Sequence, residues 1–262
     1  MIDAHCHLEH MPPEVIEEAR PKMTAIVTSI ADIKDKHAVI EMRKNNAGFV
    51  FICLGFHPEV MGQYNDKDID SYIDFIRQNK KEISAVGEVG LDYNWNTKVD
   101  EQQKSKEIFL KFIGLSKELQ LPLVIHSRNG RTPDSDGIGD AISMLIENNC
   151  KDVMMHCFSG SESQLKTCME QGWMISYATV LVKSFKHQRL AKMTPLGQML
   201  LETDAPWLDP DAPPKTFGQQ PHLTNRPWKI ERSAEVIAGL KDVSKEEILS
   251  VTERNAKRFF RI

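Results

Sequence analysis

Two histidines near the start of the chain have the spacing of a metal-binding pair. His5 and His7 follow the apolar run at residues 2–4, and Cys6 stands between them. If that run is a strand, side chains two residues apart point the same way, so both imidazoles can reach one ion while Cys6 faces the opposite side. The same spacing also suits two histidines that only form hydrogen bonds, so the pair by itself indicates metal binding weakly.

Four other apolar runs are followed by residues that bind metals. Glu88, His126 and His156 each end such a run, and Asp204 closes the sequence Leu201-Glu202-Thr203-Asp204. Each residue alone could be a hydrogen-bonded loop residue or a helix cap. One shared site accounts for all of them, together with the first pair, more simply than separate unrelated roles do.

These residues form a donor set that is large enough for two divalent cations. Two such ions can activate a water molecule and stabilise the negative charge that develops during hydrolysis. Imidazole donors favour zinc, manganese or another borderline ion, and magnesium, which prefers oxygen donors, is the alternative. The pattern therefore predicts a metal-dependent hydrolase whose metal ligands are His5, His7, Glu88, His126, His156 and Asp204.

Three further polar residues stand close to the predicted ligands in the sequence and are candidates for substrate binding. His57 lies in Gly55-Phe56-His57-Pro58, Asp92 follows Glu88, and Arg128 follows His126 by two positions. A guanidinium can hold a phosphate through two parallel hydrogen bonds, and for Arg128 a structural salt bridge is the alternative. For His57 the alternative is the stabilisation of a turn.

Rival hydrolytic chemistry lacks its motif. The chain has no G-x-S-x-G elbow of a serine hydrolase, and Ser127 and Ser159 stand beside predicted metal ligands. The five cysteines lack the paired spacing of a zinc ribbon.

Short apolar runs and amphipathic segments alternate along the whole chain. Runs that are continuously apolar are typical of strands buried on both faces of a parallel sheet. We predict strands at residues 2–4, 25–30, 50–55, 83–88, 121–126, 152–157, 173–177 and 199–203. We predict helices at residues 13–20, 33–44, 68–80, 100–119, 140–148, 163–171, 183–193, 228–240 and 245–258.

About eight strand–helix units predict an α/β fold with a parallel sheet that closes into a TIM (β/α)8 barrel. An open doubly wound sheet is the alternative, but it usually carries a G-x-G-x-x-G turn, which is absent. We expect a single domain over residues 1–262, with the segment from Asp209 through His222 as a long loop over the active face. In a barrel the C-terminal ends of the strands meet on one face, which would bring the predicted ligands together.

Composition excludes several classes of protein. With 41% hydrophobic and 27% charged residues, the chain is too apolar to be disordered, and no apolar run reaches the roughly 20 residues of a membrane span. A net charge of -4 gives no reason to expect non-specific binding to DNA or membranes, although a local basic patch is compatible with it. We expect a cytoplasmic protein with reduced thiols, no membrane association and no obligate protein partner. Basic residues that could form a patch on the active face are Arg128, Arg131, Lys183, Lys186, Lys215 and Arg226.

Taken together, the motifs resemble one known family over essentially the whole chain. They are Met1-Ile2-Asp3-Ala4-His5-Cys6-His7-Leu8, Gly87-Glu88-Val89-Gly90-Leu91-Asp92-Tyr93, Pro122-Leu123-Val124-Ile125-His126-Ser127-Arg128, His156-Cys157-Phe158-Ser159-Gly160 and Leu201-Glu202-Thr203-Asp204-Ala205-Pro206. The sequence resembles the TatD family of metal-dependent deoxyribonucleases, within the amidohydrolase-like barrels. The resemblance implies that His5, His7 and Asp204 hold one ion, and that Glu88 bridges to a second ion held by His126 and His156. It also implies hydrolysis of DNA phosphodiester bonds, often as a 3′–5′ exonuclease on single strands.

The chain departs from the family pattern at three places outside the predicted ligands. Glu9 stands where the family usually has Asp or Asn, and Asn129-Gly130 stands in a segment that usually begins an acidic helix. Arg226 replaces the glutamate of the family's Arg-Asn-Glu-Pro motif. These departures concern the choice of substrate more than the metal chemistry.

For the mechanism we expect a metal-bound water that is deprotonated with help from Asp204, with Glu88 between the two ions. An alternative function is hydrolysis of small amides, esters or lactones, which related barrels perform, often with a carboxylated lysine between their metals. Glu88 at the comparable strand favours the nuclease branch. A third alternative, a metal-binding or nucleic-acid-associated protein without turnover, is disfavoured by the complete ligand set.

Overall fold

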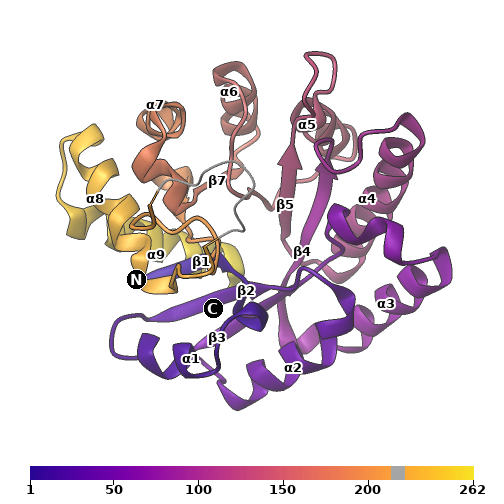
Figure 1. Ribbon diagram of the computed structural model, residues 1–262, viewed down its shortest axis with the longest axis horizontal. Helices are drawn as coiled ribbons and strands as arrows, with labels where there is room; N and C mark the ends of the chain where they lie inside the picture. The colour runs from indigo at the N-terminus through magenta and orange to yellow at the C-terminus, as the bar shows by residue number, and fades with distance from the viewer. Residues whose placement is uncertain (214–221) are drawn as a thin grey trace.

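The fold is built on one parallel sheet, seen in a computed structural model that describes residues 1–213 and 222–262. Its eight strands are hydrogen-bonded in chain order from β1 to β8, all parallel (Figure 1). Their bounds are β1 Ile2–Cys6, β2 Ala25–Ser29, β3 Val50–Leu54, β4 Ile83–Asp92, β5 Leu123–Arg128, β6 Val153–Met155, β7 Met174–Tyr177 and β8 Met199–Leu201. Each predicted strand overlaps one of these.

The sheet closes on itself at the C-terminal end of β1 and just after β8. The backbone N–H of Asp204 donates to the carbonyl of His5 at 3.0 Å, and the N–H of His7 donates to the carbonyl of Ala205 at 2.7 Å. The predicted TIM barrel is thereby confirmed. The closure also ties together two segments that carry predicted metal ligands.

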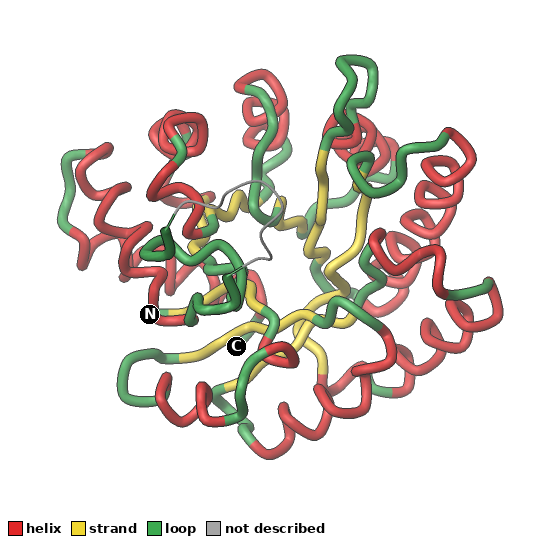
Figure 2. Tube along the Cα trace, viewed as in Figure 1, coloured by secondary structure: helices red, strands yellow, loops and turns green. Residues whose placement is uncertain are grey.

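Helices follow the strands and surround the sheet (Figures 1 and 2). Their bounds are α1 Glu14–Ala19, α2 Lys36–Asn45, α3 Asp66–Gln78, α4 Val99–Leu119, α5 Gly137–Glu147, α6 Glu162–Glu170, α7 Phe185–Met193, α8 Ile230–Lys241 and α9 Lys245–Phe260. Short 3-10 helices lie at Leu8–His10, Ile33–Asp35, Pro58–Gln63, Lys80–Glu82, Thr179–Lys183, Leu196–Gln198 and Pro227–Lys229. Local signals set several helix starts. Ser161, for example, accepts from the backbone of Gln164, whose side chain returns the bond as a capping box.

Two apolar layers hold the barrel together. Residues such as Ile26, Ile52 and Ile125 are fully buried in the layer between sheet and helices. Their neighbours on the strands, Val27 and Val124 among them, belong to a separate inner cluster, as alternation along a strand requires. The inner cluster also contains Ala256 and Phe260, so the end of α9 packs on the interior of the barrel.

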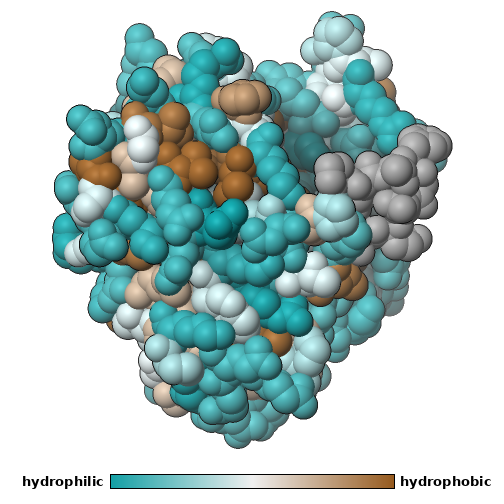
Figure 3. Space-filling view, turned by 60° about the vertical axis from the view of Figure 1, so that its left-hand side comes forward, coloured by the Kyte–Doolittle hydropathy of each residue, from teal (hydrophilic) through white to brown (hydrophobic). Residues whose placement is uncertain are grey.

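Beyond this core, the surface is mainly polar. Hydrophilic residues cover most of the face shown in Figure 3, interrupted by a patch of hydrophobic ones. All five cysteines are free. Within residues 1–213 and 222–262, no helix combines the length and the apolar character needed to cross a bilayer.

Candidate metal centre

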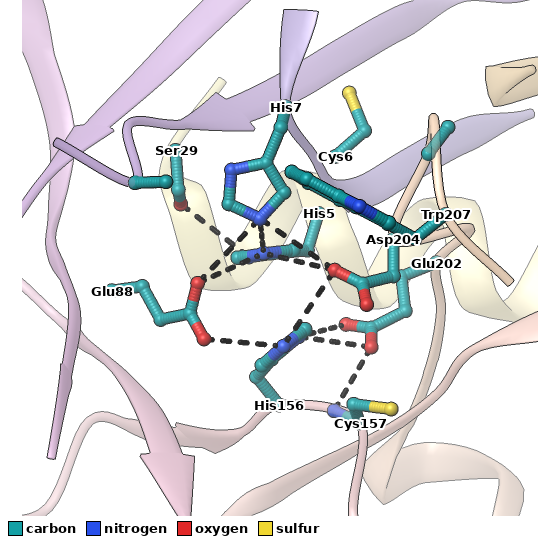
Figure 4. A network of polar contacts seen from close by, with 12 residues as sticks. His5, Cys6, His7, Ser29, Glu88, His156, Cys157, Glu202, Asp204 and Trp207 are labelled. Atoms are coloured by element: carbon teal, nitrogen blue, oxygen red, sulfur yellow. Dashed lines mark hydrogen bonds and ion pairs between the residues drawn. The ribbon is translucent and has the colours of Figure 1, made fainter. Parts of the chain in front are cut away.

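The ends of five strands bring the six predicted ligands to one place. His5 and His7 come from the end of β1, Glu88 from β4, and His126 from β5. His156 follows β6 directly and Asp204 lies shortly after β8, and Figure 4 shows His5, His7 and His156 turned toward Glu88, with Asp204 facing the same histidines. Glu88, His5, His7 and His156 are buried, and Asp204 and His126 are partly exposed.

Glu88 lies at the centre, with its two carboxylate oxygens turned to different histidines. Oε2 is 3.3 Å from Nε2 of His5 and 3.7 Å from Nε2 of His7. Oε1 is 2.6 Å from Nδ1 of His126 and 3.3 Å from Nε2 of His156. One carboxylate therefore separates two groups of nitrogen donors, as a residue that bridges two cations would.

A bulge in β4 puts Glu88 in this position. The register with β5 gains one residue on β4 between Gly87 and Val89, and the strand continues to Asp92. Our expectation that the strand ends at Glu88 is therefore wrong. Glycines at both sides permit the close approach of β5: a Cβ on Gly87 would meet Val124 at 2.6 Å, and one on Gly90 would meet the carbonyl oxygen of His126 at 2.0 Å.

β1 carries a similar irregularity at the first histidine of the pair. Its register with β2 shifts between Asp3 and Cys6, an interval that contains His5. His5 and His7 both point to the centre, while Cys6 packs in the outer layer with its thiol near the carbonyl of Val27. The expected orientations of these three side chains are thus the ones that the structure has.

Asp204 completes the cluster on the side of the histidines that lies opposite Glu88. Its Oδ1 lies 3.6 Å from Nε2 of His7, 3.7 Å from Nε2 of His5 and 4.0 Å from Nε2 of His156. Asp3 stabilises the backbone next to Asp204, because its buried carboxylate accepts hydrogen bonds from the backbone N–H of both His5 and Thr203. Asp3 therefore links the two strands that meet at the closure of the barrel.

The outer nitrogens of three histidines are each held by a second residue. Nδ1 of His7 lies 3.2 Å from Oε1 of Glu9, and Nδ1 of His156 lies 2.9 Å from Oε1 of Glu202. Nδ1 of His5 is 3.4 Å from the hydroxyl of Ser29. The carboxylate acceptors at Nδ1 of His7 and His156 favour the tautomer whose Nε2 lone pair faces the centre, which is the form that binds a metal, and the Ser29 hydroxyl can accept from His5 in the same way.

Glu202 was not among the residues predicted from the sequence to take part in the site, and Glu9 was noted there only as a departure from the family pattern. Glu202 could have been found from alternation along the chain, since it stands two residues before Asp204. Glu9 reaches His7 through its longer side chain while also accepting from the backbone N–H of Ala31 at 3.0 Å. No local sequence pattern predicts the contact between Glu9 and His7.

His57 differs from the other histidines in how its ring is oriented. The backbone N–H of Glu59 donates to its Nδ1 at 3.2 Å, so the neutral ring carries its proton on Nε2. That Nε2 lies 3.5 Å from Oε1 of Glu88 and 3.2 Å from Nδ1 of His126. In this tautomer His57 is a hydrogen-bond donor beside the cluster and supplies no lone pair to a metal.

Asp92 connects the cluster with the mouth of the pocket. It is fully buried, and its Oδ2 lies 2.8 Å from Nε2 of His126 and 2.8 Å from Nε of Arg128. Its Oδ1 accepts from the backbone N–H of Asn94 and Trp95. Asp92, which we expected to bind substrate, is thus placed to position four neighbours.

The charges of the cluster displace its pKa values in opposite directions. Burial would raise the pKa of Asp204, but its contacts with His7 and His156 outweigh this effect and hold the pKa at about 2. The pKa of Glu88 likewise lies well below its usual range despite burial, because histidines surround it. Desolvation would lower the pKa of His156, yet Glu202 and Glu88 raise it to about 9. The cluster therefore keeps its carboxylates ionised and attracts positive charge.

The donor atoms converge closely enough to hold cations. Within each of three overlapping groups, the ligand atoms all lie within 4.8 Å of one another. The groups are His5, His156 and Asp204; His5, His7 and Glu88; and His57, Glu88 and His126, although in the third group the proton on Nε2 of His57 leaves only Glu88 and His126 to bind a cation. Buried imidazoles and carboxylates in such groups suit divalent transition metals.

A pocket opens above the cluster, and its mouth is lined by Trp95, Arg128 and Trp207. Trp207 packs edge-on against His7, with ring centroids 5.0 Å apart. The loop that carries Trp207 is fixed by buried Asn225, whose side chain donates to the carbonyls of Thr203 and Trp207.

Most basic residues that we considered for a DNA-binding patch have partners within the chain. Lys183 donates to the carbonyl of Ala212 at 2.6 Å, and Lys186 donates to that of Ser159. Arg131 donates to the side chain of Asn94, and Arg226 to the carbonyl of Asn225. Lys215 lies outside the described residues. Arg128 is the member of this set that lines the pocket.

The chain is similar to known proteins over essentially its whole length. The family model described as TatD related DNase matches residues 2–261. The chain is 30% identical to human "Deoxyribonuclease TATDN3", covering 99% of this chain and 94% of that protein. It is 33% identical to the "Uncharacterized metal-dependent hydrolase YabD" of Bacillus subtilis, covering 100% and 99%. Among solved structures, YJJV, a TatD homologue from Escherichia coli, superposes with a TM-score of 0.84 at 24% identity, covering 100% of this chain and 98% of that one.

Proposed function

Because the chain belongs to the TatD-related DNase family of metal-dependent hydrolases, we propose that it is a deoxyribonuclease that hydrolyses DNA phosphodiester bonds at a two-metal site. The observation that carries the proposal is the position of Glu88, whose two oxygens face different sets of histidines. The relatives named as deoxyribonucleases support the choice of substrate.

In this proposal His5, His7 and Asp204 hold one cation, and His126 and His156 hold the other. Glu88 contacts both groups. Outer partners such as Glu9, Glu202 and Asp92 keep the imidazoles in the tautomer and orientation that binding requires. Bound zinc or manganese would supply Lewis acidity and lower the pKa of a water molecule toward about 7.

The remaining steps belong to residues of the chain. Asp204 is ionised at neutral pH, because its contacts with His7 and His156 hold its pKa at about 2. Its carboxylate can therefore accept a hydrogen bond from the attacking water, which orients that water and helps to deprotonate it. Arg128 binds a phosphate oxygen of the substrate at the mouth of the pocket. His57, protonated on Nε2, donates a hydrogen bond to an oxygen of the reacting group.

Digestion of end-labelled DNA tests this function. Metal-free protein is reconstituted with zinc, manganese or magnesium and incubated with single- and double-stranded oligonucleotides labelled at either end. We expect metal-dependent shortening from the 3′ end, and Glu88→Gln should lower the rate by about 100-fold or more, since the substitution removes the negative charge between the cations. Glu14→Gln, an exposed residue of α1, is the matched control.

Two outcomes would contradict the proposal. If DNA stays intact while metal-loaded protein hydrolyses members of an ester, lactone and amide panel, the small-molecule alternative holds. If Glu88→Gln digests DNA at the wild-type rate with unchanged metal content, the bridging role of Glu88 is wrong.

A further inference from the structure

An indole stands exposed at the mouth of the pocket above the metal centre. Trp95 lines this pocket, and yet 52% of its surface is accessible. Single exposed apolar side chains are common on protein surfaces, but Trp95 stands in the lining of a polar pocket, where an entering ligand would meet it. Its aromatic face is therefore available to a ligand that enters the pocket.

The main chain fixes Trp95 relative to the metal centre. The carboxylate of Asp92 accepts from the backbone N–H of Trp95 at 3.1 Å and, through its other oxygen, lies 2.8 Å from His126. One fully buried side chain thus holds both the indole segment and a predicted metal ligand. A ligand on Trp95 would consequently be held at a defined distance from the reacting centre.

A cation lies beside the indole. The guanidinium carbon of Arg128 is 5.9 Å from the centroid of the Trp95 ring. Nη2 of Arg128 is buried and, among the described residues, has no hydrogen-bond partner. A planar aromatic surface next to a guanidinium with a free donor matches a nucleotide, which offers a planar base and an anionic phosphate.

Trp207, the second tryptophan at the mouth of the pocket, differs from Trp95 because its ring is packed against other side chains. It packs edge-on against both His7 and His10, with ring centroids 5.0 and 5.2 Å apart. Its contacts support the metal centre, whereas Trp95 is half exposed. The two tryptophans are thus distinguishable by experiment.

We propose that Trp95 is a substrate-binding residue that stacks on a nucleobase next to the scissile phosphodiester, while Arg128 binds the phosphate. This inference rests on the proposed deoxyribonuclease function and adds that the pocket recognises a nucleobase of the substrate as well as its phosphate. Stacking does not distinguish the four bases, so the pocket selects DNA that has an unpaired base at this position over DNA that lacks one.

Abasic DNA separates stacking from every other contact. Two single-stranded oligonucleotides are compared, one normal and one whose last three nucleotides at each end lack bases. For the wild-type protein we expect kcat/KM to be about tenfold higher on the normal strand, and for Trp95→Ala the ratio should fall to near one, mainly through KM. Trp95→Phe, which keeps an aromatic face, should restore most of the ratio.

Leu110→Ala is the matched control, since Leu110 is a similarly exposed apolar residue on α4 that lies away from the pocket lining. It should retain the wild-type ratio. If Trp95→Ala keeps that ratio too, or lowers kcat/KM equally on both strands, the stacking role is wrong while the nuclease function stands. If wild-type protein with metal cleaves neither strand, the proposed function fails and the role of Trp95 falls with it.

Discussion

Removal of the Glu9 side chain should weaken metal binding without unfolding the barrel. Oε1 of Glu9 lies 3.2 Å from Nδ1 of His7 and also accepts from the backbone N–H of Ala31 at 3.0 Å. Loss of such an outer partner of a metal-binding histidine typically lowers metal affinity by about 10–100-fold. Because this oxygen is shared between two donors, we expect the lower end for Glu9→Ala, about tenfold or 1.4 kcal/mol.

The assay is competition for zinc between metal-free protein and a coloured chelator at pH 7. Glu9→Gln keeps an oxygen acceptor but loses the charge, so its affinity should fall only about threefold. Glu17→Ala is the control, because that carboxylate is 69% exposed and pairs with Arg20. Thermal unfolding of the metal-free variants checks that the barrel is intact. Wild-type zinc affinity in folded Glu9→Ala would refute the idea that Glu9 orients His7.

Two further predictions concern pH. Desolvation opposes the charge on His126 and His156, but nearby carboxylates raise both pKa values to about 9, so each ring must release a proton to bind a metal. Zinc affinity should therefore rise between pH 7 and 9 by about tenfold per pH unit for each of these histidines. Calorimetry in buffers of different ionisation enthalpy should detect the released protons. A zinc affinity that does not change with pH would contradict this prediction. Asp209 is also expected to stabilise the loop after β8: burial would raise its pKa, but Lys229 at 2.6 Å and Thr224 lower it from 3.8. A lowered pKa gives stability that is present above the ordinary value and lost as pH falls below it, so Asp209→Asn should lower the free energy of unfolding by about 1 kcal/mol at pH 7 and by progressively less in denaturant titrations at lower pH.

The barrel itself was predictable because its determinants are local. Continuous apolar runs such as residues 50–55 and 121–126 report burial on both faces of a strand, and the intervening helices report the parallel crossover. Parallel strands that close into a barrel must present their C-terminal ends together. His126, His156 and Asp204 could therefore be assigned to one place without any knowledge of distances.

Backbone irregularities and partners from distant strands were not predictable in this way. Glu88 enters the centre through a bulge, and the only local sign of it is the pair of glycines that lets β5 come close. The contact between His156 and Glu202 joins residues that are 46 positions apart. A periodic pattern describes one element at a time and carries no information on which side chains of two elements will meet.

Asp92 shows how this limit affects the interpretation of a functional residue. Next to Arg128 in a predicted pocket it looked like a contact for substrate, yet its buried carboxylate holds His126, Arg128 and the backbone of Trp95 at once. One substitution there would disturb His126, Arg128 and Trp95 together, which are the proposed metal ligand, phosphate-binding residue and stacking residue. Loss of activity in an Asp92 variant therefore could not be assigned to substrate binding. Substitutions at Trp95 and Glu9 are easier to interpret, because each affects one proposed role, base stacking at Trp95 and the orientation of His7 at Glu9. These contacts therefore set the order of the experiments: variants of Trp95 and Glu9 should be tested first, and variants of Asp92 last.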